Sequence, residues 1–297
     1  MLSGMNIDAV FSGGGVKGYS LIGACQVLEE SGYTFKRLAG TSAGSIIAAL
    51  LIAGYTSEEI ETLLLELDTK QFMDERLGAN LPLVKWLLLY KKLGLYKGDQ
   101  LQLWVAEKLA AKGIVTFVDI PKDSLRIVVS DISNGVIVVL PDDLPKYQCD
   151  MATFSIAQAV RMSCSIPFFF EPVELKCNKE TAYIVDGGVL SNFPLWLFDR
   201  ENIIKVRPVI GITLTGKSEH KPPKQIENAL GMYAALFTTM KEAHDNRYIS
   251  RKHEKNIIFI PVKHVTSSDF DITQEQKLEL IQLGRDVTDQ FLRKWTY

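Results

Sequence analysis

The chain has 297 residues, of which 47% are hydrophobic and 23% charged, so it can bury a large core, and we expect a single domain over residues 1–297. Its formal net charge is −2 at pH 7 and no block of like charge stands out, so the charge pattern gives no reason to expect nucleic-acid binding. The four cysteines show no C-x-x-C spacing, which fits reduced thiols in a cytoplasmic protein better than a disulfide framework or a zinc site.

Two features of the sequence bear on membranes. The first residues carry neither the basic region nor the apolar stretch of a secretory signal. No apolar run reaches the roughly 18 residues that a membrane-spanning helix needs. We therefore expect any membrane contact to be peripheral.

The first elements predict a strand–helix–strand unit. Residues 7–11 are typical of a buried strand, residues 12–18 of a glycine-rich turn, and the apolar spacing from residue 19 of a helix that Gly32 closes. A second strand at 35–39 ends at Ser42, and an apolar helix follows over 45–53. A β-α-β unit with a right-handed crossover is expected, so both loops leave the carboxyl ends of parallel strands, where open α/β sheets bind ligands.

The rest of the chain alternates helices with short β-rich runs. Thr56 and Glu59 form a capping box for a helix ending near Leu67, and Asp99 is expected to cap a helix that reaches Lys112. The remaining predicted elements are strands at 125–130 and 136–140 joined by an Asn-Gly turn, a helix at 152–162, strands at 168–175, 181–185, 209–214 and 257–261, and helices at 225–250 and from 273. This pattern predicts a three-layer α/β/α sandwich with a mixed, mainly parallel sheet, in which residues 225–297 complete the fold.

An apolar segment at 81–96 allows two interpretations. At helical spacing four large residues share one face, and three lysines lie at its edges: Leu83, Trp86, Leu87 and Tyr90, with Lys85, Lys91 and Lys92. The segment is either a core helix packed on the sheet or a cover over the active site that touches a bilayer.

The segment from Gly40 to Gly44 has the pattern G-x-S-x-G between a strand and a helix. A serine at such a corner lies on a tight turn, and a side chain at Gly40 or Gly44 would collide with neighbouring backbone. The hydroxyl of Ser42 would be exposed near a helix N-terminus, where developing negative charge is stabilised. These features suit a nucleophile.

The earlier glycine run, Gly13-Gly14-Gly15 followed by Gly18, fits two kinds of site. Its G-x-G-x-x-G spacing after a strand matches a dinucleotide-binding loop, although the second strand ends without the acidic residue that would bind a ribose. Consecutive glycines also let backbone N–H groups approach an oxyanion, with Lys17 as possible reinforcement.

A base is needed to activate a serine hydroxyl. The four histidines lie in the last third of the chain without supporting motifs, at positions 220, 244, 253 and 264. Asp186 is the better candidate, because it ends an apolar strand and is followed by Gly187-Gly188. Burial would have to raise the basicity of this carboxylate for it to serve as the base near neutral pH.

Together these blocks resemble the patatin-like phospholipase family, as a bacterial-type single-domain member, over residues 7 to about 195. The glycine run resembles the family's oxyanion block, the G-x-S-x-G its nucleophile elbow, Asp186-Gly187-Gly188 its aspartate block, and residues 159–167 a further block. Lys17 stands where many members have arginine. The resemblance implies a phospholipase A-type hydrolase of lipid esters without metal or cofactor, with Ser42 and Asp186 as a catalytic dyad. A catalytically silent lipid-binding member remains the alternative within the family.

Overall fold

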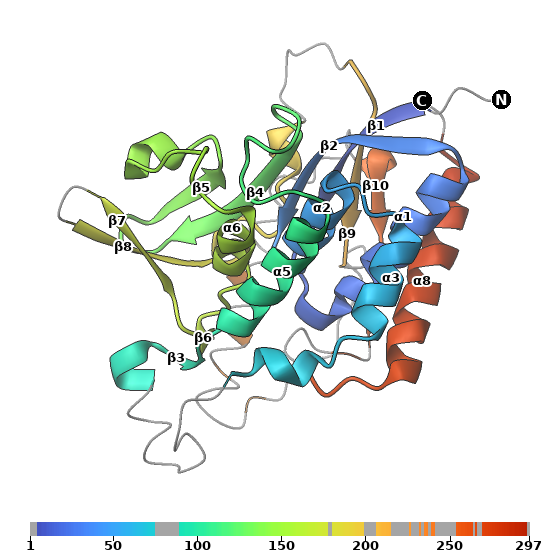
Figure 1. Ribbon diagram of the computed structural model, residues 1–297. Helices are drawn as coiled ribbons and strands as arrows, with labels where there is room; N and C mark the ends of the chain where they lie inside the picture. The colour runs from blue at the N-terminus through green and yellow to red at the C-terminus, as the bar shows by residue number, and fades with distance from the viewer. Residues whose placement is uncertain are drawn as a thin grey trace.

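The computed structural model describes residues 5–74, 89–177, 180–198, 206–214, 254–263, 265 and 269–295, with a few isolated positions between 226 and 240. Among these residues, eight strands form the central sheet: β1 (Met5–Phe11), β2 (Tyr33–Thr41), β4 (Leu125–Asp131), β5 (Val136–Leu140), β7 (Val173–Cys177), β8 (Glu180–Asp186), β9 (Val209–Thr213) and β10 (Ile257–Phe259). Their order is β10-β9-β1-β2-β4-β8-β7, and β5 also pairs with β4 (Figure 1).

The sheet is mainly parallel. β1 pairs in parallel with β2 and β9, β9 with β10, and β2 with β4. The antiparallel pairs are β4 with β5, β4 with β8 and β7 with β8. The predicted α/β class with a mixed, mainly parallel sheet is therefore confirmed, as is the parallel β1–β2 unit with its crossover helix.

The long helices of the described residues pack against one another beside the sheet: α1 (Tyr19–Glu30), α2 (Ala43–Ile52), α3 (Ser57–Leu65), α5 (Asp99–Ala111), α6 (Ile156–Ser163) and α8 (Gln274–Leu292). In Figure 1, α1, α3 and α8 lie side by side, and α5 and α6 cross in front of the sheet. Close approach of α1 and α8 requires glycine, because a Cβ at Gly23 would lie 1.9 Å from the Ile281 carbonyl oxygen.

The two faces of β1 contribute side chains to two different hydrophobic clusters, because side chains alternate along a strand. Ile7, Ala9 and Phe11 pack into the main core with the helices. Val10 points to the other face, which the described residues cover with the chain after β8, including Phe193 and a short 3₁₀ turn, η5 (Leu195–Leu197). The sheet is thus buried on both faces where its middle strands lie.

Two local predictions are wrong. Asp99 does not cap α5: the N-cap is Gly98, and the Asp74 carboxylate accepts hydrogen bonds from the N–H groups of residues 98, 99 and 100 at 2.6, 2.8 and 3.2 Å. Residues 168–175 do not form one strand, because Pro172 cannot donate to a ladder. They divide into β6 (Phe168–Phe170), which pairs with β3 (Gly94–Tyr96) in a separate two-stranded sheet, and β7.

Several local signals are confirmed. Thr56 and Glu59 form the capping box of α3, and β4 and β5 form the predicted hairpin, with Gly135 at φ 67°. The helix predicted from residue 152 begins later, at Ile156. The helix predicted at 225–250 falls almost wholly outside the described residues, and so does the apolar segment up to residue 88.

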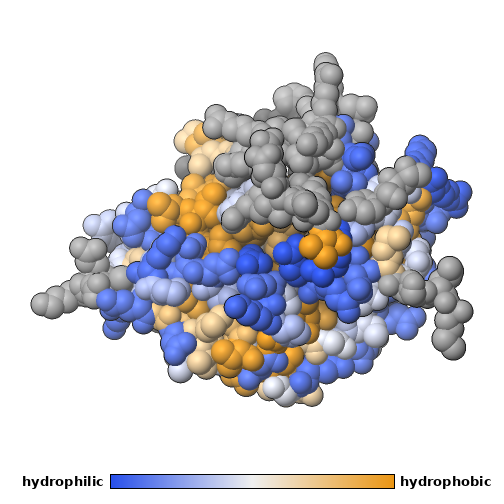
Figure 2. All heavy atoms as spheres, turned by 90° about the horizontal axis from the view of Figure 1, so that it is seen from above, coloured by the Kyte–Doolittle hydropathy of each residue, from blue (hydrophilic) through white to orange (hydrophobic). Residues whose placement is uncertain are grey.

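No helix in the described ranges is long and apolar enough to cross a bilayer. Figure 2 views the molecule from above, over the end of the sheet where β1 and β2 begin. Hydrophilic side chains form a band across this face, and hydrophobic ones gather in separate groups beside it. The carboxyl ends of the parallel strands, where the predicted site residues lie, are at the opposite end.

Candidate active site

Ser42 occupies a tight turn between β2 and α2. Its backbone has φ 52° and ψ −126°, and it is the N-cap of α2. A Cβ at Gly40 would lie 2.4 Å from the Gly44 carbonyl carbon and oxygen, and one at Gly44 would lie 2.6 Å from the Phe11 carbonyl oxygen. The collision predicted for side chains at these two glycines is therefore present. Non-glycine residues rarely adopt this backbone region, which costs roughly 1–3 kcal/mol and persists only where the surroundings enforce it.

The strands β2 and β8 meet end to end along one side of β4. β2 runs parallel to β4 and ends with Thr41 opposite Val128. β8 arrives from the opposite direction and ends with Asp186 opposite Val129, the next residue of β4. β5 pairs with residues 127–131 on the other side of β4. The carboxyl ends of two strands that are far apart in sequence are thereby brought to adjacent positions, with Ser42 leaving one and Asp186 closing the other.

The residues after Asp186 fit tightly into this junction. A Cβ at Gly187 would lie 2.2 Å from the Val128 carbonyl oxygen, so only glycine fits there. The Gly188 N–H donates to Asp186 Oδ1 at 2.7 Å, which orients the carboxylate. Asp186 and Ser42 are both buried, with 2% and 4% of their surface exposed, so the prediction of an exposed Ser42 is wrong.

The end of α6 contacts both strand ends. The Ser42 N–H donates to Ser163 Oγ at 2.9 Å, and the Ser163 hydroxyl donates to the Val128 carbonyl at 2.7 Å. Two residues on, the Ser165 carbonyl accepts from the Asp186 N–H at 2.8 Å. One three-residue segment thus holds the backbone amides of both predicted catalytic residues.

Arg161 holds this segment in place through three hydrogen bonds. It is 3% exposed and donates to Ser165 Oγ at 2.5 Å, to the Glu171 carbonyl at 2.9 Å and to the Lys97 carbonyl. Burial lowers the pKa of its guanidinium. Its contacts tie α6 to the ends of β3 and β6.

The glycine loop lies beside Ser42. The Gly13 N–H donates to the Asn192 carbonyl at 3.0 Å, and a Cβ at Gly13 would lie 3.1 Å from Ser42 Cβ. Gly14 precedes a 3₁₀ turn, η1 (Gly15–Gly18), which also contains Lys17. A Cβ at Gly18 would lie 2.8 Å from Ala43 Cβ. The glycine loop therefore contacts the turn at Ser42, and the Gly13 N–H is hydrogen-bonded to the Asn192 carbonyl.

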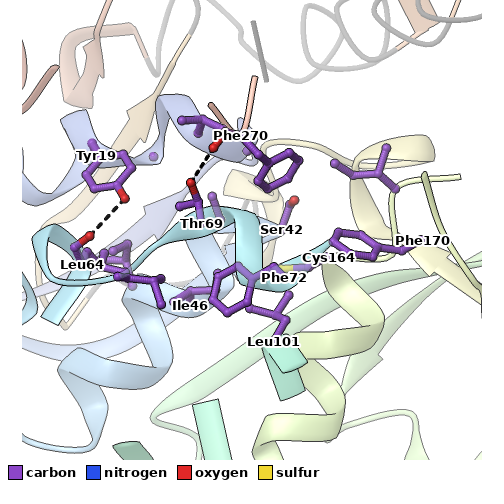
Figure 3. A pocket seen from close by; sticks show the side chains of 17 residues that line it. Tyr19, Ser42, Ile46, Leu64, Thr69, Phe72, Leu101, Cys164, Phe170 and Phe270 are labelled. Carbon is purple, nitrogen blue, oxygen red and sulfur yellow. Dashed lines mark hydrogen bonds between the residues drawn. The ribbon is translucent and has the colours of Figure 1, made fainter. Parts of the chain in front are cut away.

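An apolar pocket of about 90 Å³ opens at Ser42. Its lining is almost wholly hydrophobic: Gly15, Val16, Gly18, Tyr19, Ser42, Ala43, Ile46, Ile47, Leu64, Leu67, Thr69, Phe72, Leu101, Cys164, Ile166, Phe170 and Phe270. Figure 3 shows the Ser42 side chain among Phe270, Phe170 and Cys164. The hydroxyls of Tyr19 and Thr69 are hydrogen-bonded to the carbonyls of Leu64 and Phe270 at 3.1 and 2.6 Å. The pocket thus presents Ser42 to an apolar space.

Both Asp186 and Ser42 affect the pKa of the Cys164 thiol. Burial raises the pKa of this thiol to about 12, and the Asp186 carboxylate adds to the shift, while hydrogen bonds with Ser45 and Ser42 oppose it. Cys164 therefore stays protonated at neutral pH and is a poor nucleophile.

The four histidines fall outside the described residues. In the described ranges no group of three His, Cys, Asp or Glu side chains could hold a metal ion.

The family is settled by comparison with known proteins. A model of the patatin-like phospholipase family matches residues 9–199. The chain belongs to the patatin-like phospholipase family. Among its relatives, the protein YqhO of Bacillus subtilis (strain 168) is 54% identical over 294 residues, which cover 99% of this chain and 100% of YqhO.

One more distant relative and one solved structure are informative. The probable lipid hydrolase 463L of Invertebrate iridescent virus 6 is 28% identical over 192 residues, covering 63% of this chain and 61% of that protein. The crystal structure of VipD from Legionella pneumophila superposes with a TM-score of 0.60 at 19% identity, over 99% of this chain and 67% of VipD. At that identity the likeness to VipD shows a shared patatin-like fold.

Sequence reasoning assigned no role to Ser163, Ser165 or Arg161, although it noted the block that contains them. The available signal was their polarity: three polar residues alternate with apolar ones at the end of α6 and just beyond it. Their partners are backbone groups of other elements, which no local pattern reveals.

Proposed function

We propose that this patatin-like protein is a serine hydrolase of carboxylic esters in lipids, of the phospholipase A type. The observation that carries the proposal is the end-to-end meeting of β2 and β8 on β4, which brings Ser42 and Asp186 together beside the glycine loop. The apolar pocket at Ser42 suits an acyl chain better than a polar substrate.

The proposed chemistry follows from these groups. Ser42 Oγ attacks the ester carbonyl carbon while the Asp186 carboxylate takes the hydroxyl proton. Backbone N–H groups of Gly14 and Gly15 stabilise the oxyanion, and Gly13 shapes the loop because its amide is bonded to Asn192. Asp186 returns the proton to the leaving alcohol, and water then hydrolyses the acyl-enzyme. Gly18, Gly40, Gly44 and Gly187 stand where a Cβ would collide with neighbouring atoms, and the Gly188 N–H orients the Asp186 carboxylate.

Turnover of a short-chain ester and of phospholipid vesicles by purified variants tests the proposal. Ser42→Ala and Asp186→Asn should each lower kcat by roughly 10⁴-fold, since residues that act as a unit give losses that do not add. Replacing each of the four histidines singly should leave activity within about tenfold. A folded histidine variant as inactive as Asp186→Asn would indicate a catalytic triad instead of the Ser42–Asp186 dyad.

Two alternatives predict other results. A dinucleotide-binding protein would show cofactor absorbance and an inert Ser42, and a silent lipid-binding member would turn over no ester. The second strand ends in Gly40-Thr41-Ser42 rather than an acidic residue, which favours the hydrolase over dinucleotide binding.

We also propose that the enzyme docks on a lipid surface through an apolar patch of Tyr90, Leu93 and Phe168. These side chains are 83, 41 and 43% exposed, and Gly94 pairs with Phe168 across the two-stranded sheet. Leu93 and Phe168 have positive φ values of 60° and 64°, a conformation that costs energy and is typical of functional sites. Exposed Lys91 and Lys92 flank the patch and complement anionic headgroups. Phe170 of the same sheet lines the Ser42 pocket.

Replacing Phe168 by Asn, which tolerates positive φ, should weaken sedimentation with anionic vesicles and slow vesicle hydrolysis. Turnover of a soluble short-chain ester should change by less than about twofold. The matched control is Val136→Ser, because Val136 is 45% exposed at the start of β5. Equal losses on both substrates would assign Phe168 to the pocket wall instead of a docking surface.

A further inference from the structure

A side-chain hydroxyl bridges β2 and β4 where their pairing ends. The β2–β4 pairing stops at Thr41 and Val128. There the Ser42 N–H donates to Ser163 Oγ at 2.9 Å, and the Ser163 hydroxyl donates to the Val128 carbonyl at 2.7 Å. Ser163 is 0% exposed, so this bridge operates without competition from solvent.

The bridge acts where the backbone is most strained. A regular ladder would draw Ser42 into extended conformation and carry β2 onward along β4, into the place of β8. Ser42 instead turns to φ 52°, and such a conformation persists only where the surroundings determine it. The Ser163 hydroxyl accepts a hydrogen bond from the Ser42 amide in the turned conformation and donates one to Val128 of β4. It therefore provides what the turn needs.

The same segment also fixes Asp186, through the Ser165 carbonyl at 2.8 Å from its N–H. Movement of Ser163 would thus change the position of Ser42 relative to Asp186. A displacement of about 1 Å between reacting groups can lower a rate by about 100-fold.

We propose that Ser163 is a positioning residue for catalysis, whose hydroxyl bridge to β4 holds Ser42 in the orientation that Asp186 can activate. The inference rests on the proposed hydrolase function. Ser163 touches no reacting atom in this account, so its removal changes the rate of the chemical step and not the binding of substrate.

The test compares Ser163→Ala with Ser57→Ala. Ser57 is an equally buried serine, 2% exposed, whose hydroxyl donates to Glu29 Oε2 at 2.5 Å at the start of α3, so the control loses a buried hydrogen bond away from Ser42. For each variant we would measure kcat, KM, the melting temperature and the rate at which a fluorophosphonate labels Ser42. Ser163→Cys, of similar size but with a weak hydrogen-bonding group, keeps the test open if Ser163→Ala does not fold.

The expected result is a fall of about 10- to 100-fold in kcat and in labelling rate for Ser163→Ala, with KM within about twofold. A smaller fall is expected for Ser163→Cys, and values near those of the unmodified protein for Ser57→Ala. Unchanged kcat in a folded Ser163 variant would overturn the inference while leaving the hydrolase intact. Absence of label on Ser42 in the unmodified protein would instead overturn the proposed function.

Discussion

Replacing Ser42 by Gly should give a more stable protein than replacing it by Ala. Both variants lack the hydroxyl and should be inactive, so they differ only in how the backbone tolerates φ 52° and ψ −126°. Alanine carries the strain of roughly 1–3 kcal/mol for a non-glycine residue in this region. Glycine avoids it but loses about 0.5–1 kcal/mol in chain entropy. The net difference is about 1 kcal/mol in favour of glycine.

Urea or thermal unfolding of the two variants measures this difference, which corresponds to a few degrees in melting temperature for a chain of this size. Ser45 provides the control, because it lies in the first turn of α2 and its hydroxyl donates to the Ser42 carbonyl at 2.6 Å. There the order should invert, with Ala more stable than Gly by about 0.5–1 kcal/mol. An Ala variant at least as stable as the Gly variant at position 42 would refute the argument from strain.

Three further predictions concern the frame of the site. Gly187→Ala places a Cβ 2.2 Å from the Val128 carbonyl oxygen. Because backbone atoms cannot move aside as a flexible side chain can, we expect at least about 1–3 kcal/mol of destabilisation and loss of ester turnover. Normal activity would contradict the close approach of Gly187 to β4. Asp8 is fully buried and accepts from Arg37 Nε at 2.9 Å and Arg207 Nε at 3.0 Å. Asp8→Asn should lower the free energy of unfolding by about 1–3 kcal/mol, since both arginines keep partial solvent access. It should leave kcat unchanged, because Asp8 lies in the middle of β1, before the glycine loop that follows this strand. The pKa of the Cys164 thiol is about 12 in the folded protein and near 9 in the unfolded chain, so between these values only the unfolded chain loses the proton. The free energy of unfolding therefore falls as pH rises above about 9, by about 1 kcal/mol at pH 10. Urea unfolding at pH 8 and pH 10 should show a smaller fall for Cys164→Ala than for the unmodified protein, and an equal fall would contradict this assignment.

Local chemistry made much of the fold predictable. The glycine at position 32 after α1, the capping box at Thr56 and the Asn134-Gly135 turn each specify backbone geometry through neighbouring residues alone. The break at Pro172 was also readable, because proline inside a predicted strand argues against a continuous ladder. The capping of α5 by Asp74 was not, since the carboxylate comes from a segment 25 residues earlier than Asp99.

The types of site residue were predictable, but their meeting was not. Gly40, Gly44 and Gly187 stand where backbone would otherwise collide, and that requirement can be inferred from motif context. The end-to-end approach of β2 and β8 depends on a register between strands about 145 residues apart in sequence, which no local pattern encodes. Ser163 was missed for the same reason, because its hydroxyl bonds to two backbone groups far away in sequence, the Ser42 N–H and the Val128 carbonyl.

The central claim is that Ser42, activated by Asp186, forms a covalent acyl-enzyme. Its most direct test is to label the purified protein with a fluorophosphonate and map the modified residue by mass spectrometry. The account predicts a single adduct on Ser42, formed at a rate that Asp186→Asn lowers by at least about 100-fold. An ester-hydrolysing protein labelled at another residue, or labelled at Ser42 equally fast without the Asp186 carboxylate, would contradict it.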